Sequence, residues 1–180
     1  MTQGDFEVLE SRIREELSNI GRLSEELMHA GVLHDDATHT MPELPRDDSL
    51  VLRSIGSILH DFYCAAESLF EMIARNIDDS IPSDPEWHRT LLTQMSLELS
   101  THRPPVLRKE TVTILDEFRA FRHIFRNVYG FALDPERLER LLLRFPQAVE
   151  SLTRDMMAFL DVAKKIAPNQ TNDRGKDSTW

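Results

Sequence analysis

The stretch Asp116-Glu-Phe-Arg-Ala-Phe-Arg-His-Ile-Phe-Arg-Asn-Val-Tyr-Gly-Phe131 decides the fold. Placed on a helix at about 100° per residue, it separates into an apolar and a polar face. The apolar face covers an arc of about 140°, which predicts a helix packed against a core. Its residues are Phe118, Phe121, Ile124, Phe125, Val128 and Phe131. The polar face carries Arg119, Arg122, His123, Arg126, Asn127 and Tyr129, an unusually basic set for a chain with a net charge of -10.

Length and composition indicate a single globular domain in a reducing compartment. A chain of 180 residues is long enough to bury a core. The single cysteine, Cys64, excludes an intramolecular disulfide, and its aromatic and alanine neighbours predict a buried structural thiol rather than a nucleophile. The first residues are polar and acidic, unlike a signal peptide, and no apolar run approaches the roughly 20 residues of a membrane span. We therefore expect a cytoplasmic protein with no membrane association.

The acidic balance also restricts the partners. Broad coating of nucleic acid depends on neutralising many phosphates, which a chain of this net charge opposes. A small basic patch on an acidic body can still accept a phosphate locally.

Apolar residues recur at helical spacing along most of the chain, and no segment shows the alternation of a half-buried strand. Helices are expected over residues 5–30, 48–78, 83–99, 109–129 and from 134 onward, with Pro146 beginning a last helix that ends near 166. The broad apolar stripe of 48–78 predicts a central helix. We predict an all-α, up-and-down four-helix bundle with additional short helices.

This pattern predicts that the chain is divided into three parts. Residues 1–48 form an N-terminal helix and a flexible loop, residues 49–167 form the helical bundle, and residues 168–180 form a disordered tail. The loop contains His34 and His39 beside two aspartates. Two histidines in a flexible, proline-containing loop do not define a coordination geometry, so no metal site and no cofactor are expected.

The predicted central helix carries a polar row at i, i+3 and i+7, formed by His60, Tyr63 and Glu67. One interpretation is a structural hydrogen bond between Tyr63 and Glu67. The alternative is that Glu67 faces the arginines of the stretch 116–131.

The basic face has a chemistry of its own. Arg119, Arg122 and Arg126 are spaced three and four apart, which predicts one strip with His123 inside it. Arginine offers a planar fork that suits phosphate, and histidine can take or deliver a proton. Together they form a minimal set for metal-independent RNA cleavage. The alternative is a solvated face whose arginines pair with carboxylates such as Asp116 and Glu117, in a bundle without a site.

The segment from Arg122 to Gly130 resembles the signature of HEPN domains, and specifically of the HepT-like toxin family. That signature is an arginine, four residues, a histidine, one residue and a tyrosine. Flanking features are also similar to HepT-like proteins and extend the resemblance over roughly residues 50–160. They are Phe62-Tyr63 with Glu67, Pro82, Trp87-His88, Arg103-Pro104-Pro105, and the segment from Tyr129 to Asp134.

The resemblance implies a HEPN-like bundle and a homodimeric ribonuclease, in which two signature helices face each other to form an RNA-binding cleft. It also implies a partner, an MntA-type nucleotidyltransferase antitoxin that transfers AMP to the signature tyrosine. By position, Arg122 is the phosphate-contacting arginine, with Arg119 and Arg126 beside it, and Tyr129 is the modified residue. Tyr63 and Glu67 take supporting places.

Asn127 stands at the position of the family histidine. Asparagine cannot transfer protons near neutral pH, so the proton-transfer step needs another group. His123, one helical turn or about 5.4 Å earlier, is the candidate replacement. Two functions remain open. One is a metal-independent RNA endonuclease toxin that uses Arg122, Arg126 and His123. The other is a catalytically degenerate module that binds a nucleotidyltransferase partner, a nucleotide or RNA without cleaving.

Overall fold

The structure, a computed structural model, describes residues 2–33, 44–99, 103–127 and 133–166. Five helices run through this part of the chain: α1 (Gln3–His29), α2 (Ser49–Asn76), α3 (Trp87–Gln94), α4 (Lys109–Asn127) and α5 (Pro135–Ile166). The same residues contain no strand, and their one β-bridge joins Leu99 and Arg103. The predicted all-α fold is confirmed.

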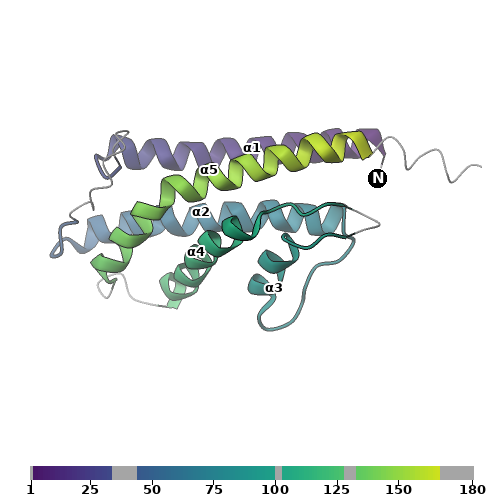
Figure 1. Cartoon of the computed structure of the whole chain (residues 1–180). Helices are drawn as coiled ribbons and strands as arrows, with labels where there is room; N and C mark the ends of the chain where they lie inside the picture. The colour runs from purple at the N-terminus through teal and green to yellow at the C-terminus, as the bar shows by residue number, and fades with distance from the viewer. Residues whose placement is uncertain (1, 34–43, 100–102, 128–132, 167–180) are drawn as a thin grey trace, which may run out of the picture.

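Helix α2 is the centre of the bundle. It packs against each of the other four helices, among which α4 and α5 also pack against each other (Figure 1). Phe62 of α2 meets the rings of Phe118 and Phe145 edge-on, with ring centroids 5.0 Å apart in both pairs. Such edge-to-face contacts add to the burial of the aromatic surface. The apolar face of α4 is thereby fixed against α2 and α5.

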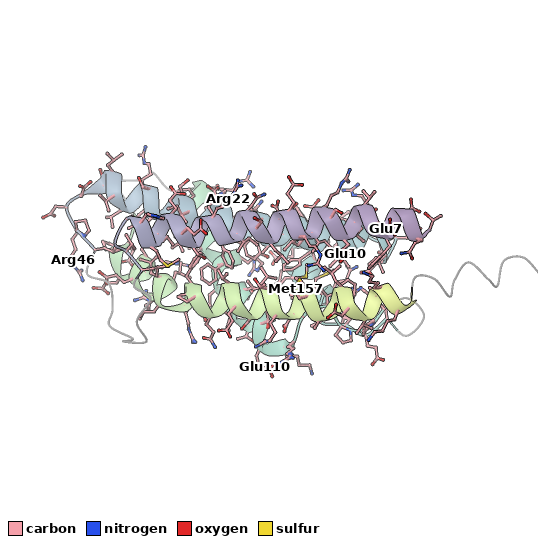
Figure 2. The ribbon with its side chains drawn as sticks, turned by 90° about the horizontal axis from the view of Figure 1, so that it is seen from above. Glu7, Glu10, Arg22, Arg46, Glu110 and Met157 are labelled. Atoms are coloured by element: carbon pink, nitrogen blue, oxygen red, sulfur yellow. The ribbon has the colours of Figure 1, made fainter. Side chains whose placement is uncertain are left out.

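Helix α1 belongs to the same core. Its buried residues are Phe6, Leu9, Ile13, Ile20 and Leu27. Figure 2 shows α1 and α5 side by side, with Met157 of α5 labelled between them near Glu10. The Sδ atom of Met157 accepts a hydrogen bond of 3.5 Å from Arg14.

Most helix ends follow their sequence signals. The side chain of Asp48 accepts hydrogen bonds from the backbone N–H groups of Leu50 and Val51, and so caps α2. Gly31 adopts a φ of 68° just after α1, where the left-handed conformation favours glycine. The predicted tail, 168–180, and residues 34–43 of the predicted flexible loop lie outside the described part. His34 and His39 are among them.

Three predicted helix boundaries were wrong, one of them the end of α3, which lies at Gln94 rather than at residue 99. Pro146 does not begin a helix, because α5 runs without a break from Pro135 to Ile166. A proline inside a helix removes one backbone hydrogen bond. The side chain of Pro146 is exposed, while Phe145 and Ala148 beside it are fully buried, so packing of the apolar face offsets the lost bond. Helix α3 begins at Trp87 rather than at Ser83 or Asp84, after a turn in which Asp84 accepts from the backbone N–H of Glu86.

Two buried carboxylates fix the connections around α3 and α4. Asp78, after the end of α2, forms a two-pronged ion pair with Arg103, at 2.6 and 2.7 Å. Asp155 of α5 accepts hydrogen bonds from the backbone N–H of Arg108 and the hydroxyl of Thr111, at 2.9 and 2.6 Å. A carboxylate at the start of α4 is also stabilised by the helix dipole. The first contact ties the segment after α3 to the end of α2, and the second ties the start of α4 to α5.

None of the helices in the described ranges combines the length and the apolar composition of a membrane span.

Candidate functional site

Helix α4 presents the two faces that the sequence predicted, up to its last described residue. Phe118 and Phe121 are fully buried. Phe125 is half-buried and lies so close to Gly56 of α2 that a Cβ atom there would stand 2.7 Å from its ring. The polar residues His123, Arg126 and Asn127 are exposed. Residues 128–132 lie outside the described part, and with them Val128, Tyr129 and Phe131.

Arg122 does not lie on an exposed strip with the other arginines, as the spacing had predicted. Its guanidinium turns toward α2, where Nη2 lies 3.1 Å from Oε2 of Glu67. The side chain of Arg122 is 14% exposed and that of Glu67 is 5% exposed. A buried carboxylate is stable only with a partner, and Arg122 is that partner. The alternative in which Glu67 faces the arginines of α4 is therefore confirmed.

His88, at the start of α3, completes this cluster. Its Nδ1 lies 2.6 Å from Oε1 of Glu67, and its Nε2 lies 3.3 Å from Nη1 of Arg122. The imidazole also stacks on Trp87, with ring centroids 3.6 Å apart. Glu67, His88 and Arg122 come from three different helices, α2, α3 and α4. Glu67 thus holds a cation and an imidazole at the same time.

Cys64 lies at the edge of the cluster. Its Sγ is 3.4 Å from Nε of Arg122 and 3.7 Å from both ring nitrogens of His60. Its side chain is only partly buried, so the prediction of a buried thiol was wrong. Residues 65 and 66 do point into the core, but Cys64 faces α4 at the position where Arg122 crosses α2.

Tyr63 is fully buried, and its hydroxyl has no hydrogen-bond partner among the described residues. The predicted hydrogen bond between Tyr63 and Glu67 is therefore absent, because Glu67 is occupied by Arg122 and His88. Burial, together with the nearby charge of Glu67, raises the pKa of Tyr63 far above its usual range. The phenol stays neutral, and its ring packs in the core beside Glu67.

Arg119 has a carboxylate partner within α4 itself, since its Nε lies 2.6 Å from Oδ1 of Asp116. Partial burial favours the neutral form, but the hydrogen bond and charge of Asp116 outweigh it and raise the pKa of Arg119. For Arg119, the interpretation of arginines paired with the protein's own carboxylates is correct. Arg126 and His123 are exposed near the described end of α4.

Asn127 also turns back onto its own helix. Its side-chain amide donates a hydrogen bond of 2.7 Å to the backbone carbonyl of His123. Asn127 therefore makes its side-chain contact within the last described turn of α4. The side chain at the histidine position of the signature has a structural contact and no group that transfers protons near neutral pH.

Comparison with protein families decides the assignment. The family described as HepT-like protein matches residues 54–163, which is more than half of the chain. The chain belongs to this family. No curated protein and no solved structure matches it. The match spans α2 to α5 and every residue of the cluster, whereas α1 precedes it.

Sequence reasoning did not single out His88 as a site residue of this HepT-like chain. Trp87-His88 was noted only as a flanking feature, because the apolar spacing that predicts a helix here does not reveal the partner of a polar side chain. Its link to Arg122 depends on how α3 packs against α2 and α4. In the described residues, no three histidine, cysteine or acidic side chains are grouped so that they could hold a metal ion.

Proposed function

We propose that this HepT-like chain is the toxin of a HEPN and nucleotidyltransferase toxin–antitoxin pair, and that it cleaves RNA without a metal ion. The observation that supports this most is the position of Arg122 between Glu67 and His88. A guanidinium has five N–H groups. The described contacts direct one of them to Cys64, one to His88 and one to Glu67. One N–H on each terminal nitrogen is left to meet the oxygens of a phosphate.

The charge around Arg122 supports the same proposal. Arg126 and His123 are exposed on the last turns of α4, whereas Glu67 already balances the charge of Arg122. An exposed arginine such as Arg126 on an otherwise acidic protein attracts a phosphate locally, and the remaining surface repels further RNA. This pattern fits a local cut better than coating of a long strand.

Regulation and assembly are part of the proposal. Tyr129 follows α4 by two positions in the sequence and is the proposed acceptor of AMP from an MntA-type nucleotidyltransferase. Two copies of α4 facing each other across a dimer axis would bring two Arg126 side chains to one RNA strand. Added negative charge at Tyr129 would repel RNA phosphate next to those arginines.

Asn127 supports a second candidate, a degenerate HepT-like module that binds RNA, a nucleotide or the nucleotidyltransferase without cleaving. Its amide is bonded to the helix backbone, so it supplies neither a proton nor a clear contact for substrate. This candidate predicts that the wild type is inert and that Asn127→His gains cleavage.

The test is incubation of purified protein with RNA in a metal chelator. We expect wild-type protein to cleave, and Arg122→Lys to lose activity about 100-fold or more, the scale expected when a charge-stabilising donor is removed. Lysine keeps a positive charge opposite Glu67, so loss of folding does not explain the effect. Arg75→Ala is the matched control, because Arg75 is an exposed arginine of α2 whose partner is Glu71. Intact RNA with wild type and cleaved RNA with Asn127→His would favour the second candidate.

A further inference from the structure

We propose that His88, oriented by Glu67, is the group that accepts the proton of the RNA 2′-hydroxyl, in place of the histidine that Asn127 replaces. This inference rests on the proposed ribonuclease function. It assigns the proton-transfer step to a residue of α3, outside the signature helix, and it gives Glu67 the role of a positioning residue.

The tautomer of His88 follows from its two neighbours. A carboxylate accepts hydrogen bonds, so the 2.6 Å contact with Glu67 requires a proton on Nδ1. A guanidinium only donates, so the 3.3 Å contact with Arg122 requires a lone pair on Nε2. His88 is therefore the neutral imidazole with its basic nitrogen directed at the phosphate-binding arginine. A carboxylate behind an imidazole fixes this tautomer and stabilises the cation formed when a proton arrives.

His88 can also reach the substrate. Its side chain is 26% exposed, and Trp87 stacks on one face of the ring, which limits its rotation. The charged groups that face it from the packed helices are Glu67 of α2 and Arg122 of α4. When Arg122 turns to place its two remaining terminal N–H groups on a phosphate, it gives up its contact with Nε2, which then lies next to the bound phosphate without a donor. A 2′-hydroxyl beside that phosphate then meets a free lone pair.

His123 fits this role less well. Its side chain is exposed on the adjoining face of α4, and no carboxylate among the described residues forms an ion pair with it. His88 has both an orienting carboxylate and a contact with Arg122. Preorganisation of this kind is what distinguishes a general base from a surface histidine.

The chemical step is a transesterification. The 2′-oxygen bonds to the adjacent phosphorus while its proton passes to Nε2 of His88, and Arg122 stabilises the charge that gathers on the phosphate oxygens. The bond from phosphorus to the 5′-oxygen of the next nucleotide breaks, and that oxygen takes a proton from water. The hydroxide formed then removes the proton from His88. The products are a 2′,3′-cyclic phosphate and a 5′-hydroxyl, with no oxidant or metal required.

The test compares wild type with His88→Asn and His88→Ala in RNA cleavage without metal. Asparagine can keep a donor toward Glu67 but lacks Nε2, so folding is retained and the base is lost. We expect His88→Asn to slow cleavage about 100-fold or more and to flatten the acidic limb of the pH–rate profile. Added imidazole should restore part of the activity of His88→Ala, which a structural role for His88 does not predict.

The possible failures are distinguishable. Wild-type protein that cleaves while His88→Asn retains its rate within a few fold would overturn the assignment of His88 and leave the ribonuclease function intact. Wild-type protein that leaves RNA intact would overturn both. Nitrogen chemical shifts of His88 in the free protein give a check that is independent of RNA. A proton on Nε2 rather than Nδ1 at neutral pH would also overturn the inference.

Discussion

Arg103→Met tests the account of how α3 is held in place. The side chains of Arg103 and Asp78 are 2% and 1% exposed, so the ion pair is almost fully buried. Arg103 binds Asp78 through two nitrogens and also donates to the backbone carbonyls of Gln94, Leu97 and Pro104, at 3.1 to 3.2 Å. Methionine keeps much of the volume but leaves the carboxylate of Asp78 with the side-chain amide of Gln94 as its one partner among the described residues.

Removing one partner of a buried ion pair costs about 3–5 kcal/mol, because the other charge stays desolvated. We therefore expect Arg103→Met to lower the free energy of unfolding by that amount in urea titrations at neutral pH. Arg75→Met is the control. Arg75 and Glu71 approach only to 3.8 Å and are 67% and 36% exposed, so this change should cost no more than about 0.5 kcal/mol.

A double variant separates the cost of the unpaired charge from the cost of altered packing. If the cost of Arg103→Met comes from the unpaired carboxylate, then Asp78→Leu added to Arg103→Met should recover a large part of the lost stability. Arg103→Met that costs less than about 1 kcal/mol, or a double variant no more stable than the single one, would refute the reasoning.

Two further predictions concern helix contacts. Gly56→Ala should destabilise the protein by about 1 kcal/mol, because crowding against Phe125 outweighs the better helix propensity of alanine. Gly21→Ala should instead stabilise the protein by about 0.5–1 kcal/mol, since nothing lies within 4 Å of the new Cβ atom. The urea midpoints of the two variants measure both effects. Equal effects would contradict the role given to Phe125. Burial of Asp155 favours its neutral form, but the hydrogen bonds that it accepts outweigh burial and hold its pKa below the ordinary value of 3.8. The stabilisation that these bonds give the folded protein is therefore present above that pH and is lost as the pH falls through the folded pKa. Asp155→Asn should cost about 2 kcal/mol at neutral pH, and its difference from wild type should shrink below about pH 4 in acid titrations; a constant difference would show that the charge of Asp155 does not matter.

The sequence predicted the part of the fold that depends on periodicity. The apolar positions of α4 and the broad stripe of α2 specify which faces meet, and Phe118 and Phe121 are buried accordingly. The prediction that a helix begins at Pro146 was wrong, because packing of the residues on both sides of the proline keeps α5 continuous. That outcome depends on tertiary contacts, which local signals do not contain.

The candidate site was predicted in composition but not in arrangement. Helical spacing placed Arg119, Arg122 and Arg126 on one strip. That prediction did not consider Glu67. Its buried carboxylate pairs with Arg122, which turns inward and away from Arg126. His88 was missed because its role arises from the packing of α3 beside α2 and α4, which no spacing within one helix reveals. The roles of Tyr129 and of the dimer remain proposals.

The role of Arg122 is best checked by the rate of RNA cleavage in a metal chelator, compared between wild type and Arg122→Lys. We expect cleavage by wild type, giving a 2′,3′-cyclic phosphate end, and a loss of about 100-fold or more when the fork of Arg122 becomes a single ammonium group. Equal rates for the two proteins, or RNA that stays intact with folded wild-type protein, would contradict it.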